Sequence, residues 1–191
     1  MNLHADGAHE RRRQLSPIPK HAASQVGRLL LADALREAPI GGDLHARRRE
    51  IVFAVCFAES YLFEWVRDQV LGGDFHRLAI YLPSGDKRGI RQRWKEVVKR
   101  LRDEQIIPAS PDFGLPYWEH FDQLVDYRDG LVHAGASRPT SSARPMQEGA
   151  VPSVEALQTM PRGWPVRVVV ELVRRLHAAV GSATPAWLVE P

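Results

Sequence analysis

The sequence predicts an all-α fold: one bundle of four to five helices, preceded by a basic arm. In several long segments the apolar residues recur three and four positions apart, a spacing that collects them on one side of a helix. Proline and glycine, which end helices, stand between those segments. The chain shows no β-hairpin signal, internal repeat or glycine-rich phosphate loop. We therefore expect helices alone to build the core.

The composition is that of one globular domain. The chain has 191 residues, of which 44% are hydrophobic and 26% charged, enough apolar residues for a sizeable core. Its pI is about 9.3, but the formal net charge is only +3, so basic residues matter where they are concentrated. The single cysteine, Cys56, favours a reducing, cytoplasmic location. The longest apolar run, 51–63, is interrupted by Glu59 and Ser60, and we expect neither a membrane span nor a signal peptide.

The chain begins with a basic arm and a first helix. Residues 1–20 carry three consecutive arginines and then two prolines, which predicts a flexible arm that is either solvated or in contact with nucleic acid. Residues 21–185 form the single helical domain. Its first helix covers 21–38 and ends before Pro39.

A long helix over 44–71 is predicted to be the central, buried one, because it is apolar nearly all round. Asp43 is its expected cap. Glu59 is the odd residue inside it. Its carboxylate either reaches solvent or a nearby arginine, or it is the buried partner of Arg128.

The segment after this helix, 74–86, fits a short strand or one more helical turn equally well. It is followed by an amphipathic helix over 88–104. Four basic residues line one flank of that helix, at i, i+4, i+8 and i+11. This basic ribbon is either a contact surface for the phosphates of RNA or a plain solvated face. Its members are Arg91, Lys95, Lys99 and Arg102.

The last third of the chain contains two further helices, over 116–139 and 165–180, the second closed by Gly181. One or two helical turns over 154–160 precede the final helix. A loop over 138–152, rich in serine, proline and arginine, follows the helix over 116–139 and precedes these short turns.

The helix over 116–139 carries the residues of chemical interest. Its apolar residues collect on one side, while Asp129 and His133 lie on the opposite, polar side and are neighbours at a spacing of four. Arg128 points into the apolar side, where an unpaired charge is costly. His133 is about 140° round the helix from Arg128, so each belongs to a different contact surface.

The segment from Arg128 to His133 resembles the R-x4–6-H motif of the HEPN family, the higher eukaryote and prokaryote nucleotide-binding domains. In that family the residue after the arginine is typically Asn, Asp or His, and Asp129 matches. The context is also similar, since the motif ends a helix that begins with aromatic residues and follows a long apolar helix containing Ala58, Glu59 and Ser60.

The resemblance implies an HEPN-like bundle that dimerises through the motif helix, with one composite site built by two protomers. It implies a metal-independent endoribonuclease without a cofactor, acting as a toxin or defence effector, with RNA as substrate. A nucleotidyltransferase-type antitoxin is then a candidate protein partner. Members that have lost the activity imply an alternative, a non-catalytic module that binds nucleotide, nucleic acid or a protein.

The three motif residues suit RNA cleavage, because RNA supplies its own nucleophile, the 2′-hydroxyl. His133 titrates near neutral pH and can act as base or acid. Arg128 keeps its charge, and its planar fork matches phosphate oxygens. Asp129 is placed to orient His133 or raise its pKa. The sequence has no Cys/His pattern with metal-ligand spacing, so we predict no metal site.

Overall fold

A computed structural model describes residues 25–38, 43–71, 89–107, 116–133 and 152–188. Within these ranges the chain forms helices and no strand, which confirms the all-α prediction. The arm predicted at 1–20, the ambiguous segment 74–86 and residues 138–151 of the predicted loop lie outside the described residues. The described helices are α1 (Gln25–Glu37), α2 (Leu44–Leu71), α3 (Ile90–Asp103), α4 (Tyr117–His133), α5 (Val154–Thr159) and α6 (Trp164–Ala179).

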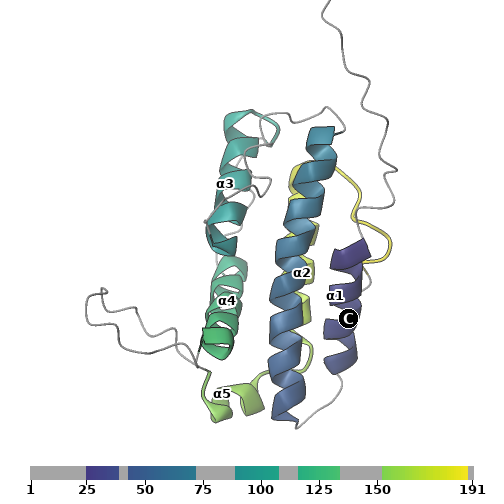
Figure 1. The fold of residues 1–191 in the computed structure, drawn as a ribbon. Helices are drawn as coiled ribbons and strands as arrows, with labels where there is room; N and C mark the ends of the chain where they lie inside the picture. Colours follow the sequence, from purple (N-terminus) through teal and green to yellow (C-terminus); the bar gives the residue numbers. More distant parts are fainter. Residues whose placement is uncertain (1–24, 39–42, 72–88, 108–115, 134–151, 189–191) are drawn as a thin grey trace, which may run out of the picture.

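Helix α2 is the axis of the bundle. In Figure 1, α1 lies on one side of it, α3 and α4 lie on the other, and α6 lies behind. Helices α1 and α4 run in the direction opposite to α2 and α6. The short α5 crosses the end of the bundle where α4 finishes and α6 begins.

The central position of α2 follows from its apolar sequence, as predicted. Most of its middle is buried, from Ile51 to Val66. Its start is capped as expected, because Asp43 Oδ1 accepts the backbone N–H of His45 at 2.8 Å. Such a helix buries apolar surface against neighbours on several sides, which the arrangement in Figure 1 provides.

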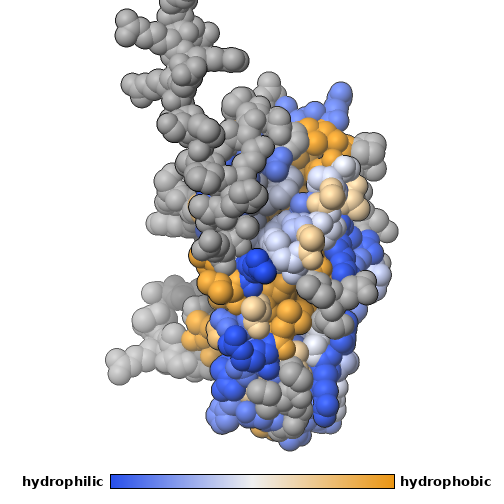
Figure 2. All heavy atoms as spheres, turned by 90° about the vertical axis from the view of Figure 1, so that its right-hand side faces the viewer, coloured by the Kyte–Doolittle hydropathy of each residue, from blue (hydrophilic) through white to orange (hydrophobic). Residues whose placement is uncertain are grey.

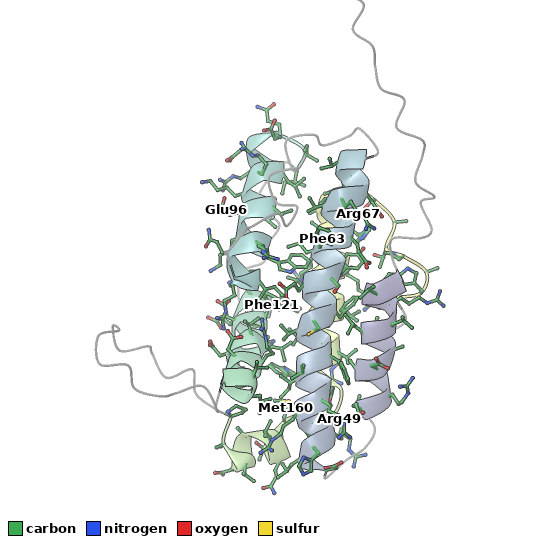
Figure 3. The ribbon with its side chains drawn as sticks, viewed as in Figure 1. Arg49, Phe63, Arg67, Glu96, Phe121 and Met160 are labelled. Carbon is green, nitrogen blue, oxygen red and sulfur yellow. The ribbon has the colours of Figure 1, made fainter. Side chains whose placement is uncertain are left out.

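Helix α3 is amphipathic, as its pattern predicts. The five apolar residues of the predicted stripe are all buried. Trp94 packs edge-on against Phe121 of α4, with ring centroids 6.3 Å apart. Figure 3 shows Phe121 directed toward α2, whereas Glu96 projects from the outer side of α3. The stripe consists of Ile90, Trp94, Val97, Val98 and Leu101.

Helices α4 and α6 pack against each other through aromatic side chains at both ends. The Arg175 guanidinium lies 3.6 Å above the Tyr117 ring, near the start of α4. Further along α4, the Tyr127 and Trp164 rings are 6.4 Å apart. Beyond α6, Gly181 takes a left-handed conformation, φ +68°, that ends the helix as predicted.

Helix α1 is less deeply buried than its sequence suggests. Leu31 and Ala34 belong to the core, whereas the side chains of Val26 and Leu29 remain 57% and 64% exposed. Figure 2 views the molecule from the side that carries α1 and shows apolar patches among polar surface. The apolar residues of α1 therefore divide between the core and the surface.

Candidate functional site

Arg128 lies where α4 passes α2. Its side chain is 22% exposed, so the guanidinium is half-buried and not fully enclosed by its own chain. Burial raises the pKa of the Cys56 thiol on α2, and the positive charge of Arg128 opposes that shift. Arg128 is therefore close enough to the middle of α2 for its charge to act there.

The recorded ion-pair partner of Arg128 is its neighbour in the chain. Its Nε lies 3.2 Å from Asp129 Oδ1, but this buried nitrogen has no partner that meets hydrogen-bond geometry among the described residues. Successive residues of a helix diverge by about 100°, which makes such a pair poorly aligned. The guanidinium thus keeps capacity to bind a further anionic group.

Glu59, the alternative partner considered for Arg128, is paired elsewhere. Its Oε1 lies 3.3 Å from Nη1 of Arg93 on α3, and its side chain is 42% exposed. The carboxylate is therefore both bound to an arginine and open to solvent. No ion pair between Glu59 and Arg128 is present among the described residues.

The motif occupies the last turns of α4. His133 is the last residue of the helix, about 7.5 Å along the axis from Arg128. Between them, Gly130 is buried, while the Val132 side chain is 52% exposed. The apolar side of α4 thus leaves the core before the helix ends, and it carries an exposed valine within the motif.

Arg91, the first member of the basic ribbon, is engaged with α4. Its Nε lies 3.2 Å from Asp122 Oδ1, and its Nη2 lies 2.5 Å from Asp126 Oδ1. Its Nη2 also donates to the backbone carbonyl of Asp122 at 2.6 Å. Arg91 therefore links α3 to α4, and two acidic residues offset its charge.

The other three members of the ribbon extend toward solvent. Lys95 is exposed, with Nζ 5.0 Å from the Trp118 ring centroid. Lys99 is exposed as well. Arg102 is exposed and lies 3.1 Å from Asp103 Oδ1 through its Nη2. These three cations make the more accessible part of the ribbon.

A further polar cluster, which the sequence reasoning missed, lies on the other side of α2. The Tyr61 hydroxyl and Nε2 of His177 form a hydrogen bond, and His177 Nδ1 lies 2.8 Å from Ser182 Oγ. Burial lowers the pKa of His177 and raises that of Tyr61, which keeps both groups neutral. One signal was available: His177 falls on the apolar stripe of α6, four residues after Val173.

Among the described residues, no group of three or more His, Cys, Asp or Glu side chains is placed to hold a metal ion. None of the helices in the described ranges has the length and apolar character needed to cross a membrane. No protein-family model matches the chain, and neither a curated protein nor a solved structure matches it significantly.

Proposed function

We propose that this protein is a metal-independent endoribonuclease of the HEPN type, acting in the cytoplasm as a toxin or defence effector. The observation that supports it most is the state of Arg128. Its guanidinium is half-buried, and its Nε lacks a well-aligned partner among the described residues. A guanidinium held in this way suits a phosphate, because charged hydrogen bonds to an oxyanion use its remaining donors.

In this proposal His133 carries the proton transfers. One histidine removes the proton of the RNA 2′-hydroxyl, and a second one protonates the leaving 5′-oxygen. Arg128 stabilises the charge that develops on the phosphorus oxygens. The products are a 2′,3′-cyclic phosphate and a 5′-hydroxyl. Asp129 orients the imidazole or raises its pKa when the site is assembled.

Two histidines require two protomers, so the proposal includes a homodimer formed through α4. The exposed Val132 side chain, within the motif itself, supports α4 as the contact surface. An apolar side chain at an interface loses contact with water, which favours association. RNA then reaches the site along the ribbon, chiefly through Lys95, Lys99 and Arg102, which are exposed.

The alternative is a non-catalytic HEPN-like module that binds nucleotide, nucleic acid or a protein, for example an antitoxin of the nucleotidyltransferase type. One observation favours it. Asp129 Oδ1 lies 3.2 Å from Arg128 Nε, so the two motif charges offset each other within the chain. A purely structural role for this pair would leave His133 without a partner in catalysis.

The experiment that separates the two functions is an RNA cleavage assay in EDTA. We expect the purified protein to cleave labelled RNA without divalent metal and His133→Ala to be inactive. His45→Ala, a substitution of an exposed histidine at the start of α2, is the matched control and should retain activity. RNA binding without cleavage by the wild type would instead support the non-catalytic module.

A further inference from the structure

A cleft opens between α2 and the segment that follows α6. Figure 1 shows this segment on the side of α2 away from α4. Its volume is about 480 Å³, within the range of sites that bind small molecules. Acidic, aromatic and hydroxyl groups line it together, and no lysine or arginine is among the lining residues. The residues used in the argument are Tyr61, Glu64, Trp65, Asp68, His177 and Trp187.

Glu64 is the most deeply placed charged group of the cleft. The residue is only 7% exposed. Its Oε1 accepts the backbone N–H of Gly27 on α1, at a long 3.4 Å. Among the described residues Glu64 forms no ion pair, and the nearby Arg67 pairs with Asp68. The backbone N–H groups of Gly27 and Val26 and the charge of Arg67 stabilise the carboxylate, but burial still outweighs them and raises its pKa. The carboxylate therefore favours a further positively charged partner.

Asp68 stands one helical turn beyond Glu64, so the two carboxylates are neighbours on α2. Asp68 Oδ1 lies 3.6 Å from Arg67 Nε, a loose contact that offsets only part of its charge. Burial raises the pKa of both carboxyls, and the charge of Asp68 raises that of Glu64 further, while the charge of Arg67 opposes both shifts without cancelling them. A cation between them would relieve both effects.

His177 does not supply that positive charge. Both of its ring nitrogens are in hydrogen bonds, to Tyr61 and to Ser182. Burial also lowers its pKa, so the imidazole is neutral at pH 7. The wall that His177 forms is therefore polar and uncharged, and the cleft keeps its negative character.

Aromatic rings form another part of the lining. Tyr61 and Trp187 approach each other with ring centroids 6.1 Å apart and planes inclined by 59°. Trp65 also lines the cleft. Aromatic faces attract cations, and the attraction grows when the cation leaves water. Carboxylates and aromatic rings in one cleft form a combination suited to an organic cation.

We propose that this cleft binds a small organic ammonium ion, with N–H groups that bind Glu64 and Asp68 and a hydrocarbon part that contacts Trp65 and Trp187. A linear polyamine has this chemistry. The formal net charge of the protein is +3, so overall electrostatics oppose the binding of cations. Saturable binding of a cation would therefore indicate binding in this cleft and not attraction by the overall charge of the protein. The proposal is independent of ribonuclease activity.

Isothermal titration of the full chain with spermidine, at fixed ionic strength, tests it. We expect saturable binding to one site and a rise of Tm with spermidine concentration. Glu64→Gln should weaken binding at least about tenfold, because it removes a buried charge from the complex. Asp68→Asn should weaken it less, since its carboxylate is more exposed. Glu155→Gln, an exposed residue of α5, is the control and should bind like wild type.

Two further measurements define the ligand chemistry. Trp187→Leu should weaken spermidine binding without changing the charge of the cleft. If Glu64→Gln fails to fold, the affinity of Trp187→Leu for spermidine tests the proposal. Magnesium ions and neutral 1,4-butanediol should not compete with spermidine. Binding that survives both Glu64→Gln and Trp187→Leu would overturn the proposal. So would the absence of saturable binding, or full competition by magnesium.

Discussion

Arg93 of α3 and Glu59 of α2 form an ion pair, with Nη1 and Oε1 3.3 Å apart. The pair ties α3 to the central helix and occupies the carboxylate nearest the middle of α2. Arg128 is consequently left with Asp129 as its recorded ion-pair partner, and its Nε has no aligned hydrogen bond among the described residues. A half-buried arginine in this state keeps hydrogen-bond donors that its own chain does not use.

Two alanine variants should therefore differ in stability while sharing a loss of activity. His133→Ala should lower RNA cleavage by about 10²–10⁴-fold, the usual contribution of general acid–base catalysis. It should leave Tm nearly unchanged, because residue 133 ends the helix. Arg128→Ala should abolish cleavage and also lower Tm, because the Arg128 side chain is half-buried and its removal leaves space that it fills. Activity and Tm are to be measured on both proteins.

The pattern of the two results distinguishes catalysis from folding. If Arg128→Ala keeps its activity while losing stability, Arg128 is structural and plays no part in cleavage. Arg128→Lys adds a second criterion: it keeps the charge but loses the planar fork, so binding of phosphate should suffer more than stability.

The oligomeric state should depend on Val132. We expect light scattering to show a dimer at micromolar concentration and Val132→Glu to shift it to a monomer, because a carboxylate would be buried in the contact. Val154→Glu on α5 is a close control, since both valines are 52% exposed. A wild-type monomer, or equal effects of the two substitutions, would contradict dimerisation through α4.

Much of the fold could be predicted from the sequence, because helical periodicity is a local property. The buried stripe of α3 and the cap of α2 at Asp43 were readable for this reason. The exposure of Val26 and Leu29 could not be predicted from the sequence, because it depends on how much of α1 the other helices cover. Elements can be identified one by one, whereas their burial is decided by their packing.

The candidate sites were predictable only in part. Arg128, Asp129 and His133 share one helix, so their neighbourhood is fixed by spacing. The pairing of Arg91 with Asp122 and Asp126 joins residues more than thirty positions apart in the sequence. The cleft likewise depends on Trp187, which comes from a segment without helical periodicity. Contacts of this kind require tertiary structure.

The ribbon should contribute to RNA binding mainly through its exposed lysines. Lys95→Glu combined with Lys99→Glu should weaken RNA binding and reduce the slope of log K against log salt by about 2 or more, because each phosphate contact releases counterions. Arg28→Glu with Arg48→Glu changes the same charge at exposed positions of α1 and α2 and serves as control. An unchanged slope would make the ribbon a solvated face.

Arg91→Glu should behave differently from these lysine variants. It places a third carboxylate beside Asp122 and Asp126, so repulsion between α3 and α4 should lower Tm. RNA binding by Arg91→Glu and by wild type therefore has to be compared at equal concentrations of folded protein. Circular dichroism measures the folded fraction of each.

Glu50 makes stability depend on pH. It is fully buried, and its Oε2 lies 3.3 Å from Arg47 Nη1, while its Oε1 has no hydrogen-bond partner among the described residues. Arg47 also donates to the backbone carbonyl of Pro161, at 3.4 Å. Burial raises the pKa of Glu50 to about 6, and the charge of Arg47 opposes that rise without cancelling it.

The folded protein therefore binds a proton at Glu50 more tightly than the unfolded chain, whose carboxyl has the ordinary pKa of 4.5. This contribution to stability is fully present below pH 4.5 and is lost as pH rises through about 6. The loss is at most about 2 kcal/mol. Glu50→Gln imitates the protonated form, so its free energy of unfolding relative to wild type should rise between these pH values and level off above pH 7. Urea unfolding across this pH range measures the difference in free energy of unfolding between Glu50→Gln and wild type, with Glu155→Gln as control. If that difference is constant or falls with pH, the pKa of Glu50 is not raised by folding.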